Sequence, residues 1–246
     1  MGEAINDITT AAGAISNYGE FIKNTMEKKM KVEIWSDIMC PFCYIGKRKF
    51  EAALVLFPQR DSIEVVWHSF QLDPSITYQP EKDAYTYVAE LKGQTREWSV
   101  KIHESVILTA KSVGLEYNFD KVKITNSFDA HRVIQLAKKY NLTDKIEERF
   151  FKAYFTEGAL MSDHGTLVRL ATEVGIDKQE VQNVLSTNLY AEEVRKDGEE
   201  AQHIGANGVP FFVMDRKYAV SGAQDPNVFL ETLTKSFDGW KLNTPT

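Results

Sequence analysis

The chain has 246 residues, 43% of them hydrophobic, and a formal net charge of −6 at pH 7. This length allows one large or two small globular domains, and the acidic balance argues against a nucleic-acid-binding surface. No stretch reaches the roughly 18 consecutive apolar residues of a membrane span, so we expect neither nucleic acid nor a membrane as a partner.

The N-terminal segment, residues 1–29, is expected to be an extension that is helical or disordered. Its first positive charge is Lys23, and residues 8–19 are mostly small or polar, which makes it a poor secretory signal. The sequence has two cysteines, and they are too close together to cross-link distant segments. Because such cysteine usage is typical of a reducing compartment, we expect a cytoplasmic protein.

Residues 31–36 alternate in polarity like a half-buried strand, and the apolar residues over 46–57 recur with a helical period. Cys40 and Cys43 fall between these two segments, so the pair is predicted at a strand-to-helix junction. A second strand is predicted at 63–68. Together these elements form a β-α-β unit.

The middle of the chain is predicted to be helical, and its end returns to strands. Helices are expected at 98–113, 130–140, 145–156, 165–174, 178–186 and 190–204. Strands at 209–214 and 217–221 should form a hairpin, and Asp225-Pro226 should start a closing helix.

This order predicts an α/β thioredoxin-like fold with a central mixed sheet and an inserted all-helical domain. The thioredoxin-like domain would comprise residues 30–78 and 206–240. The inserted helical domain would comprise residues 79–205.

The cysteine spacing indicates chemistry rather than stabilisation. A bridge between Cys40 and Cys43 closes a ring of only four residues, so it removes little entropy from the unfolded chain. A helix N-terminus favours the thiolate that a nucleophilic cysteine requires. We therefore predict that Cys40, near the first turn, attacks, and that the deeper Cys43 resolves the mixed disulfide. Pro41 and Phe42, between them, are expected to contact the substrate.

Several other residues are weaker candidates. A proline that opens a strand is unusual, and in this fold Val209-Pro210 is expected to be a cis bond beside the cysteines that contacts the substrate. His131 and Asn126 form a polar group that could face a substrate, although a hydrogen-bonded helix histidine explains His131 equally well. Asp37 could move a proton during resolution, or it could cap a loop.

A lone pair of cysteines could also be half of a zinc site, which needs four ligands. The chain has no other cysteine, and its five histidines are widely scattered. We therefore expect no metal, and no cofactor beyond a redox-active disulfide between Cys40 and Cys43.

From about residue 30 to 237, the chain resembles the DsbA-like thioredoxin superfamily, specifically its FrnE-like branch of dithiol oxidoreductases. The matching stretches are residues 32–37, 40–46, 69–74, 130–132, 151–155, 208–213 and 218–224. The resemblance implies a thioredoxin fold with a helical insertion, thiol–disulfide exchange at Cys40 and Cys43, and a cis bond before Pro210.

The leading hypothesis is a thiol–disulfide oxidoreductase or isomerase acting on protein or small-molecule thiols, as a monomer or homodimer. Glutathione could serve as its co-substrate. The same superfamily contains glutathione-dependent kappa-class transferases and hydroxychromene carboxylate isomerases, which have a serine where Cys40 stands. A transferase or isomerase of that kind is the alternative, and a redox-sensing binding module is a third. The direction of electron flow stays open.

Overall fold

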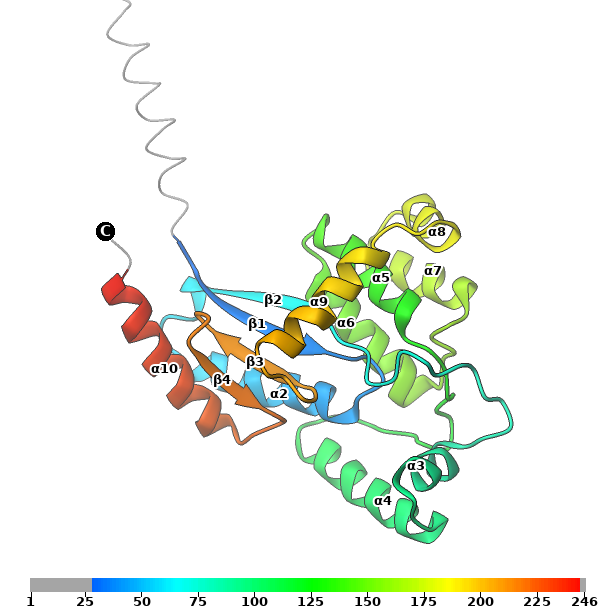
Figure 1. Ribbon diagram of the computed structural model, residues 1–246. Coiled ribbons are helices and arrows are strands. Elements are labelled where there is room, and N and C mark those ends of the chain that lie inside the picture. Colours follow the sequence, from blue (N-terminus) through cyan, green and yellow to red (C-terminus); the bar gives the residue numbers. More distant parts are fainter. Residues whose placement is uncertain (1–27, 244–246) are drawn as a thin grey trace, which may run out of the picture.

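The computed structural model describes residues 28–243, so the expected extension at 1–29 lies almost entirely outside the described residues. A four-stranded sheet with the order β2-β1-β3-β4 forms the centre (Figure 1). The strands are β1 (Met30–Ser36), β2 (Ile63–Ser69), β3 (Phe211–Met214) and β4 (Tyr218–Ser221). Strands β1 and β2 are parallel, and the other two pairs are antiparallel. The predicted α/β fold with a mixed sheet is confirmed.

Helices cover both faces of the sheet because alternate residues of its central strands are apolar on each face. Helices α2 (Pro41–Leu56) and α10 (Pro226–Asn243) pack on one face, where the rings of Phe50, Phe212 and Phe229 meet. On the other face, Trp35 packs against α9 (Ala191–His203). The sheet is thus the middle of three layers.

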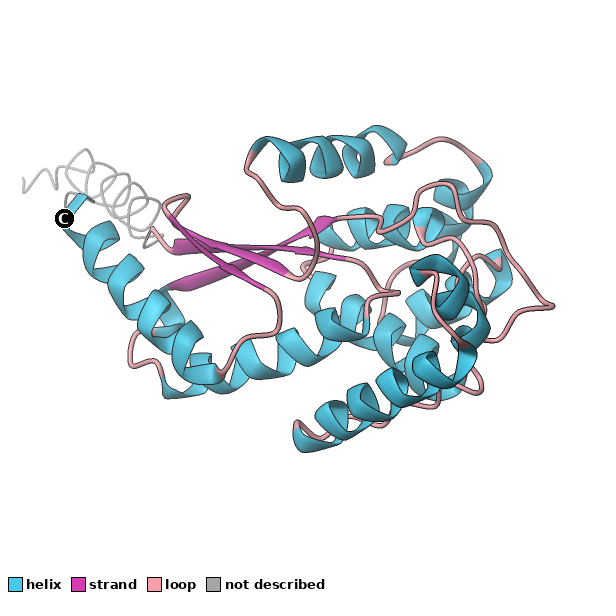
Figure 2. Cartoon of the chain, turned by 60° about the horizontal axis from the view of Figure 1, so that its bottom comes forward, coloured by secondary structure: helices cyan, strands magenta, loops and turns pink. Residues whose placement is uncertain are grey.

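The chain between β2 and β3 forms a helical insertion beyond one end of the sheet (Figure 2). Before α9 it contains α3 (Ala84–Lys92), α4 (Arg96–Ser112), α5 (Phe128–Lys138), α6 (Thr143–Lys152), a π-helical turn (Ala153–Glu157), α7 (His164–Glu173) and α8 (Lys178–Ser186). A short 3-10 turn (Arg60–Ser62) precedes β2. No helix within residues 28–243 is long and apolar enough to cross a membrane.

The insertion packs directly on α2 and so holds the start of that helix in place. The ring of Tyr44 on α2 stacks on Phe151 with centroids 4.9 Å apart. Lys47, which is almost fully buried, pairs with Asp144 and Glu148 of the insertion, each at 3.2 Å. The cysteine-bearing end of α2 is therefore fixed from the sheet on one side and from the insertion on the other.

Candidate active site

Cys40 and Cys43 lie at the N-terminus of α2. Cys40 is the N-cap residue, with extended backbone angles, and Pro41 is the first helical residue, where it sacrifices no helical hydrogen bond. The Cys40 N–H donates to the Asp37 carbonyl at 2.9 Å, and the Cys43 N–H donates to the Cys40 carbonyl at 3.0 Å. The chain thus turns sharply from β1 into α2, and both cysteines are free thiols.

The two sulfurs have different surroundings. The Cys40 thiol donates to the Val209 carbonyl at 3.4 Å, and its neighbour Phe42 is 45% exposed. Cys43 is only 1% exposed, and burial together with the adjacent Cys40 raises the pKa of its thiol well above the usual value. Cys40 is itself 5% exposed, so both cysteines are buried and Cys40 is slightly the more accessible of the two.

Pro210 lies against α2 at the point where Gly46 leaves room for it. A Cβ added at Gly46 would come within 2.9 Å of the Pro210 Cγ. The peptide bond between Val209 and Pro210 is cis in the structure, and the Pro210 carbonyl accepts a hydrogen bond from the Gly222 N–H at 2.8 Å. The sequence-predicted residues Val209 and Pro210 are thus brought beside the cysteines.

Asp37 fixes the loop that precedes Cys40. Its carboxylate accepts hydrogen bonds from the Met39 N–H at 3.1 Å and from the Leu72 N–H at 2.8 Å. Of the two roles expected for Asp37, loop capping is therefore visible. The same carboxylate also lies 3.5 Å from Nε2 of His131, which is ion-pair range but too long for a good hydrogen bond.

His131 and Asn126 are not available to a substrate in this structure. The His131 side chain is fully buried on α5, and its nearest polar neighbour is the Asp37 carboxylate. It does not reach the surface in this structure, and its role stays a prediction. The Asn126 amide accepts from Gln71 and Phe128 and donates to the carbonyls of Pro74 and Ile76. All four of its hydrogen-bonding positions are filled, so it anchors a loop instead.

Two residues near the cysteines did not emerge from the sequence. The Tyr117 hydroxyl donates to the Pro41 carbonyl at 2.7 Å, and burial together with the two cysteines raises its pKa. Glu147, on α6, is fully buried, and burial raises its pKa to about 8. Glu147 shares the helical face of Phe150 and Phe151, a spacing that could have indicated its burial.

One group within residues 28–243 has the composition of a metal site, namely His68, Asp197 and Glu200. The His68 ring already contacts Asp197 through Nδ1 at 2.8 Å and Glu33 through Nε2 at 3.1 Å. Glu200 pairs with the guanidinium of Arg216. The charged groups of this cluster are thus paired with one another or with neighbouring residues. The contact between His68 and Asp197 links β2 to α9.

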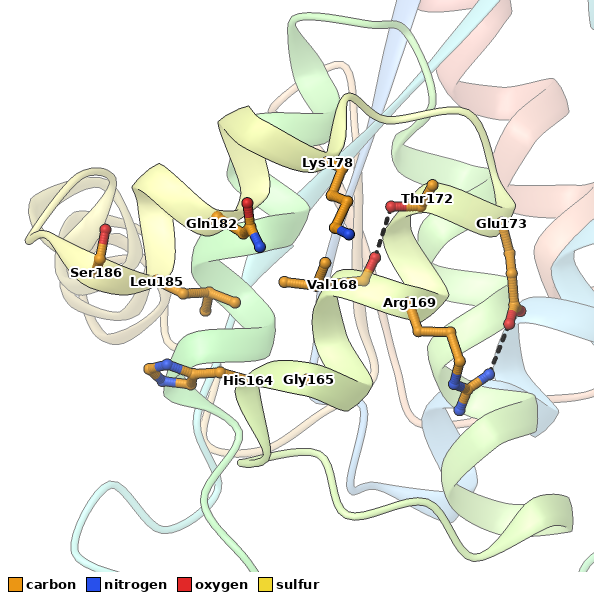
Figure 3. Close-up of a pocket in the computed structure, with 10 residues that line it drawn as sticks. All are labelled: His164, Gly165, Val168, Arg169, Thr172, Glu173, Lys178, Gln182, Leu185 and Ser186. Atoms are coloured by element: carbon orange, nitrogen blue, oxygen red, sulfur yellow. Dashed lines mark hydrogen bonds and ion pairs between the residues drawn. The ribbon is translucent and has the colours of Figure 1, made fainter.

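A cavity of about 720 Å³ lies between α7 and α8 (Figure 3). Its apolar floor includes Val168 and Leu185, and its rim carries charged side chains such as Arg169, which pairs with Glu173. None of the residues predicted for the site lines this cavity. The arrangement around Cys40 and Cys43 is therefore separate from it.

Comparisons with known proteins agree with this geometry. The family model described as DSBA-like thioredoxin domain matches residues 31–234. The uncharacterized protein YwbO of Bacillus subtilis (strain 168) is 29% identical over 205 residues, which are 82% of this chain and 95% of that protein. A crystal structure described as a probable DsbA oxidoreductase from Streptomyces coelicolor is 40% identical, with a TM-score of 0.81 over 88% of this chain and 92% of that one.

A more distant structure shares the fold alone. The cytosolic disulfide reductase DsbM from Pseudomonas aeruginosa, solved with GSH, has a TM-score of 0.59 at 16% identity. The match covers 87% of this chain and 100% of that one.

Proposed function

The chain belongs to the family of DSBA-like thioredoxin domains, and we propose that it exchanges disulfides with protein or small-molecule thiols through Cys40 and Cys43. One observation carries this proposal. Cys40 occupies the N-cap position of α2 next to the exposed ring of Phe42, whereas Cys43 lies one turn further into the helix and is 1% exposed. We further propose that the protein belongs to the FrnE-like branch and works in the cytoplasm.

In the reductive direction, the Cys40 thiolate attacks one sulfur of a substrate disulfide. The bond between Cys40 and that sulfur forms, the substrate S–S bond breaks, and the other substrate sulfur leaves as a thiolate. Cys43 then loses its proton and attacks the Cys40 sulfur, which releases the second substrate thiolate and leaves the Cys40–Cys43 disulfide. The oxidative direction is the same sequence reversed.

The start of α2 and the segment that precedes β3 each contribute to this cycle. Cys40 occupies the N-cap position of α2, at the positive end of the helix dipole. Phe42 offers an exposed apolar ring beside Cys40, and the Val209 backbone lies within reach of the same sulfur. We propose that Pro41, Phe42, Val209 and Pro210 contact the substrate chain around its reacting disulfide.

The test is turnover of a fluorescent peptide that carries one disulfide, with glutathione as the reductant. Cys43→Ser should abolish turnover and accumulate a mixed disulfide on Cys40, visible by mass spectrometry. Cys40→Ser should form no adduct at all. If Cys43→Ser keeps most of the wild-type turnover, the dithiol cycle is wrong and a glutathione-dependent mechanism takes its place.

A further inference from the structure

The cavity between α7 and α8 has the size and the lining of a small-molecule site. Its volume of about 720 Å³ falls within the roughly 300–1,000 Å³ of ligand pockets, which combine an apolar lining with a few polar groups. Val168 of α7 is half-buried there, and Leu185 of α8 is only 7% exposed. The cavity therefore offers an apolar surface that a ligand could cover.

The two helices contribute facing rows of side chains to this cavity. On α8, Lys178, Gln182 and Leu185 are spaced i, i+4 and i+7, so they share one face of the helix. Figure 3 shows these side chains reaching from α8 into the space beside Val168 of α7. The row therefore changes from polar to apolar over about 10 Å of helix.

The apolar end of the cavity is open. Gly165, in the first turn of α7, lines this end and has no side chain. A Cβ added at Gly165 would have only the Asp163 carboxylate within 4 Å, so nothing from α8 closes the space above it. A ligand that extends past Leu185 therefore has room.

The acidic residue of the lining is already paired with two cations. The carboxylate of Glu173 accepts hydrogen bonds from Arg149 at 2.7 Å and from Arg169 at 2.6 Å. At the other end of α7, His164 contacts Asp129 at 2.9 Å. These carboxylates therefore leave no charge in the cavity that would attract a cationic ligand.

Two donors of the lining have no partner. Within residues 28–243, neither the Lys178 ammonium nor the Gln182 amide forms a hydrogen bond or an ion pair. By contrast, the hydroxyls of Thr172 and Ser186 donate to carbonyls of their own helices. Because Lys178 and Gln182 are one turn apart, they present a positive charge and an amide donor side by side.

We propose that this cavity binds a small carboxylate that carries an apolar tail or ring. Lys178 and Gln182 each donate to one carboxylate oxygen, and the tail lies over Val168 and Leu185. A cation would be repelled by Lys178, and a neutral apolar molecule would leave both donors without an acceptor. The site does not involve the two cysteines, so it goes beyond the proposed thiol–disulfide exchange.

Titration calorimetry with octanoate as the probe tests this site. The wild type should bind one octanoate per chain. Acetate lacks the tail and octylamine has the opposite charge, so both should bind at least about tenfold more weakly. The affinity for octanoate should also fall as NaCl is added, because salt screens a charge pair at the surface.

Two variants test the donors, and each has a matched control. Lys178→Met should weaken octanoate binding at least about tenfold, and Gln182→Leu should weaken it about threefold. Lys101→Met and Gln179→Leu make the same changes at exposed positions outside the cavity, and both should bind octanoate like the wild type. All four side chains are exposed, so we expect folded variants, which circular dichroism checks.

Loss of octanoate binding in Lys178→Met but not in Lys101→Met would support the site. Three results would overturn it. They are no binding of octanoate to the wild type at millimolar concentration, equal affinities for acetate and octanoate, and equal affinities of Lys178→Met and the wild type for octanoate.

Discussion

Cys40 and Cys43 are three positions apart at the start of one helix, and we propose that they have opposite tasks. Cys40 lies where the helix begins, beside Val209 and an exposed Phe42 ring. Cys43 lies one turn further in, where burial keeps its proton in place. In the proposed cycle, a single helical turn separates the sulfur that attacks the substrate from the sulfur that completes the exchange.

Tyr117 holds the backbone between these two sulfurs. Tyr117→Phe removes the hydroxyl that donates to the Pro41 carbonyl, and should lower the free energy of unfolding by about 1–3 kcal/mol. Urea denaturation monitored by fluorescence measures this. Tyr78→Phe, at a ring that is 44% exposed, should change it by less than about 0.5 kcal/mol. Equal effects of the two variants would show that the Pro41 contact contributes nothing.

The position of the two cysteines at a strand-to-helix junction could be predicted because its signal is local. Predicting two cysteines at the start of a helix requires no information about residues far away in the chain. His131 and Asn126 were assigned to the substrate because a polar group on a helix gives no sign of which way it faces. Their true surroundings depend on residues far away in the chain, such as Asp37 for His131 and Pro74 for Asn126.

At the scale of elements, the site depends on how closely β3 approaches α2. The closest contact is at Gly46, the position on α2 against which Pro210 packs. A glycine inside a helix normally weakens it by roughly 0.5–1 kcal/mol, so its presence here has a packing reason. The absence of a side chain lets Pro210 lie against α2, with Val209 next to Cys40.

Gly46→Ala should therefore destabilise the fold and slow the reaction. The added Cβ would overlap Pro210, so we expect the free energy of unfolding to fall by about 1–3 kcal/mol. We also expect Cys40 to react more slowly with the aromatic disulfide DTNB, measured by stopped-flow absorbance. Gly198→Ala is the matched control, because nothing lies within 4 Å of its added Cβ in α9. It should stabilise the protein by about 0.4–1 kcal/mol. A Gly46→Ala variant as stable and reactive as Gly198→Ala would refute the contact.

Most elements could be predicted from hydrophobic periodicity, but α3 could not. Only Ala84 and Ala89 of this helix are buried, and its ends are set by single residues. Asp83 accepts a hydrogen bond from the Thr86 N–H, and Gly93 ends the helix with a left-handed φ of 61°. The predicted helix at 145–156 is also α-helical only to Lys152, after which it widens into a π-helical turn that nothing in the local pattern signals.

At the scale of the whole molecule, α9 closes the insertion back onto the sheet through His68. The ring stacks on Trp35 with centroids 4.3 Å apart and lies between the carboxylates of Asp197 and Glu33. Burial lowers the pKa of His68, but hydrogen bonds to Asp197 and Glu33 outweigh it and raise the pKa overall.

Where the inserted domain begins and ends stays a prediction.

The contacts of His68 should make stability depend on pH. Because the pKa of His68 is higher in the folded state, its contribution is fully present below the unfolded value of about 6.5 and is lost as pH rises above it. As the pH rises above about 6.5, the contribution of His68 should lower the free energy of unfolding by at most about 1.4 kcal/mol per pH unit. In His68→Gln the fall should be shallower, with the remaining slope due to groups such as His131, whose pKa is also raised.

His103→Gln tests whether the direction of the pKa shift decides where stability depends on pH. Burial lowers the pKa of His103, so its contribution changes below about pH 6.5 and this variant should leave the slope above that pH unaltered. Chemical denaturation between pH 5 and 9 compares the three proteins. A His68→Gln profile parallel to that of the wild type above about pH 6.5 would contradict the account of His68.

The central claim is that Cys40 and Cys43 form a reversible intramolecular disulfide. The most direct measurement equilibrates the protein in graded glutathione buffers, alkylates the free thiols and counts them by mass. We predict a single two-electron transition between a form with two alkylated cysteines and a form with none. A midpoint near about −270 mV would indicate a reductase, and one between about −120 and −180 mV an oxidant or isomerase. A glutathione adduct alone, or no disulfide at any ratio, would contradict the claim.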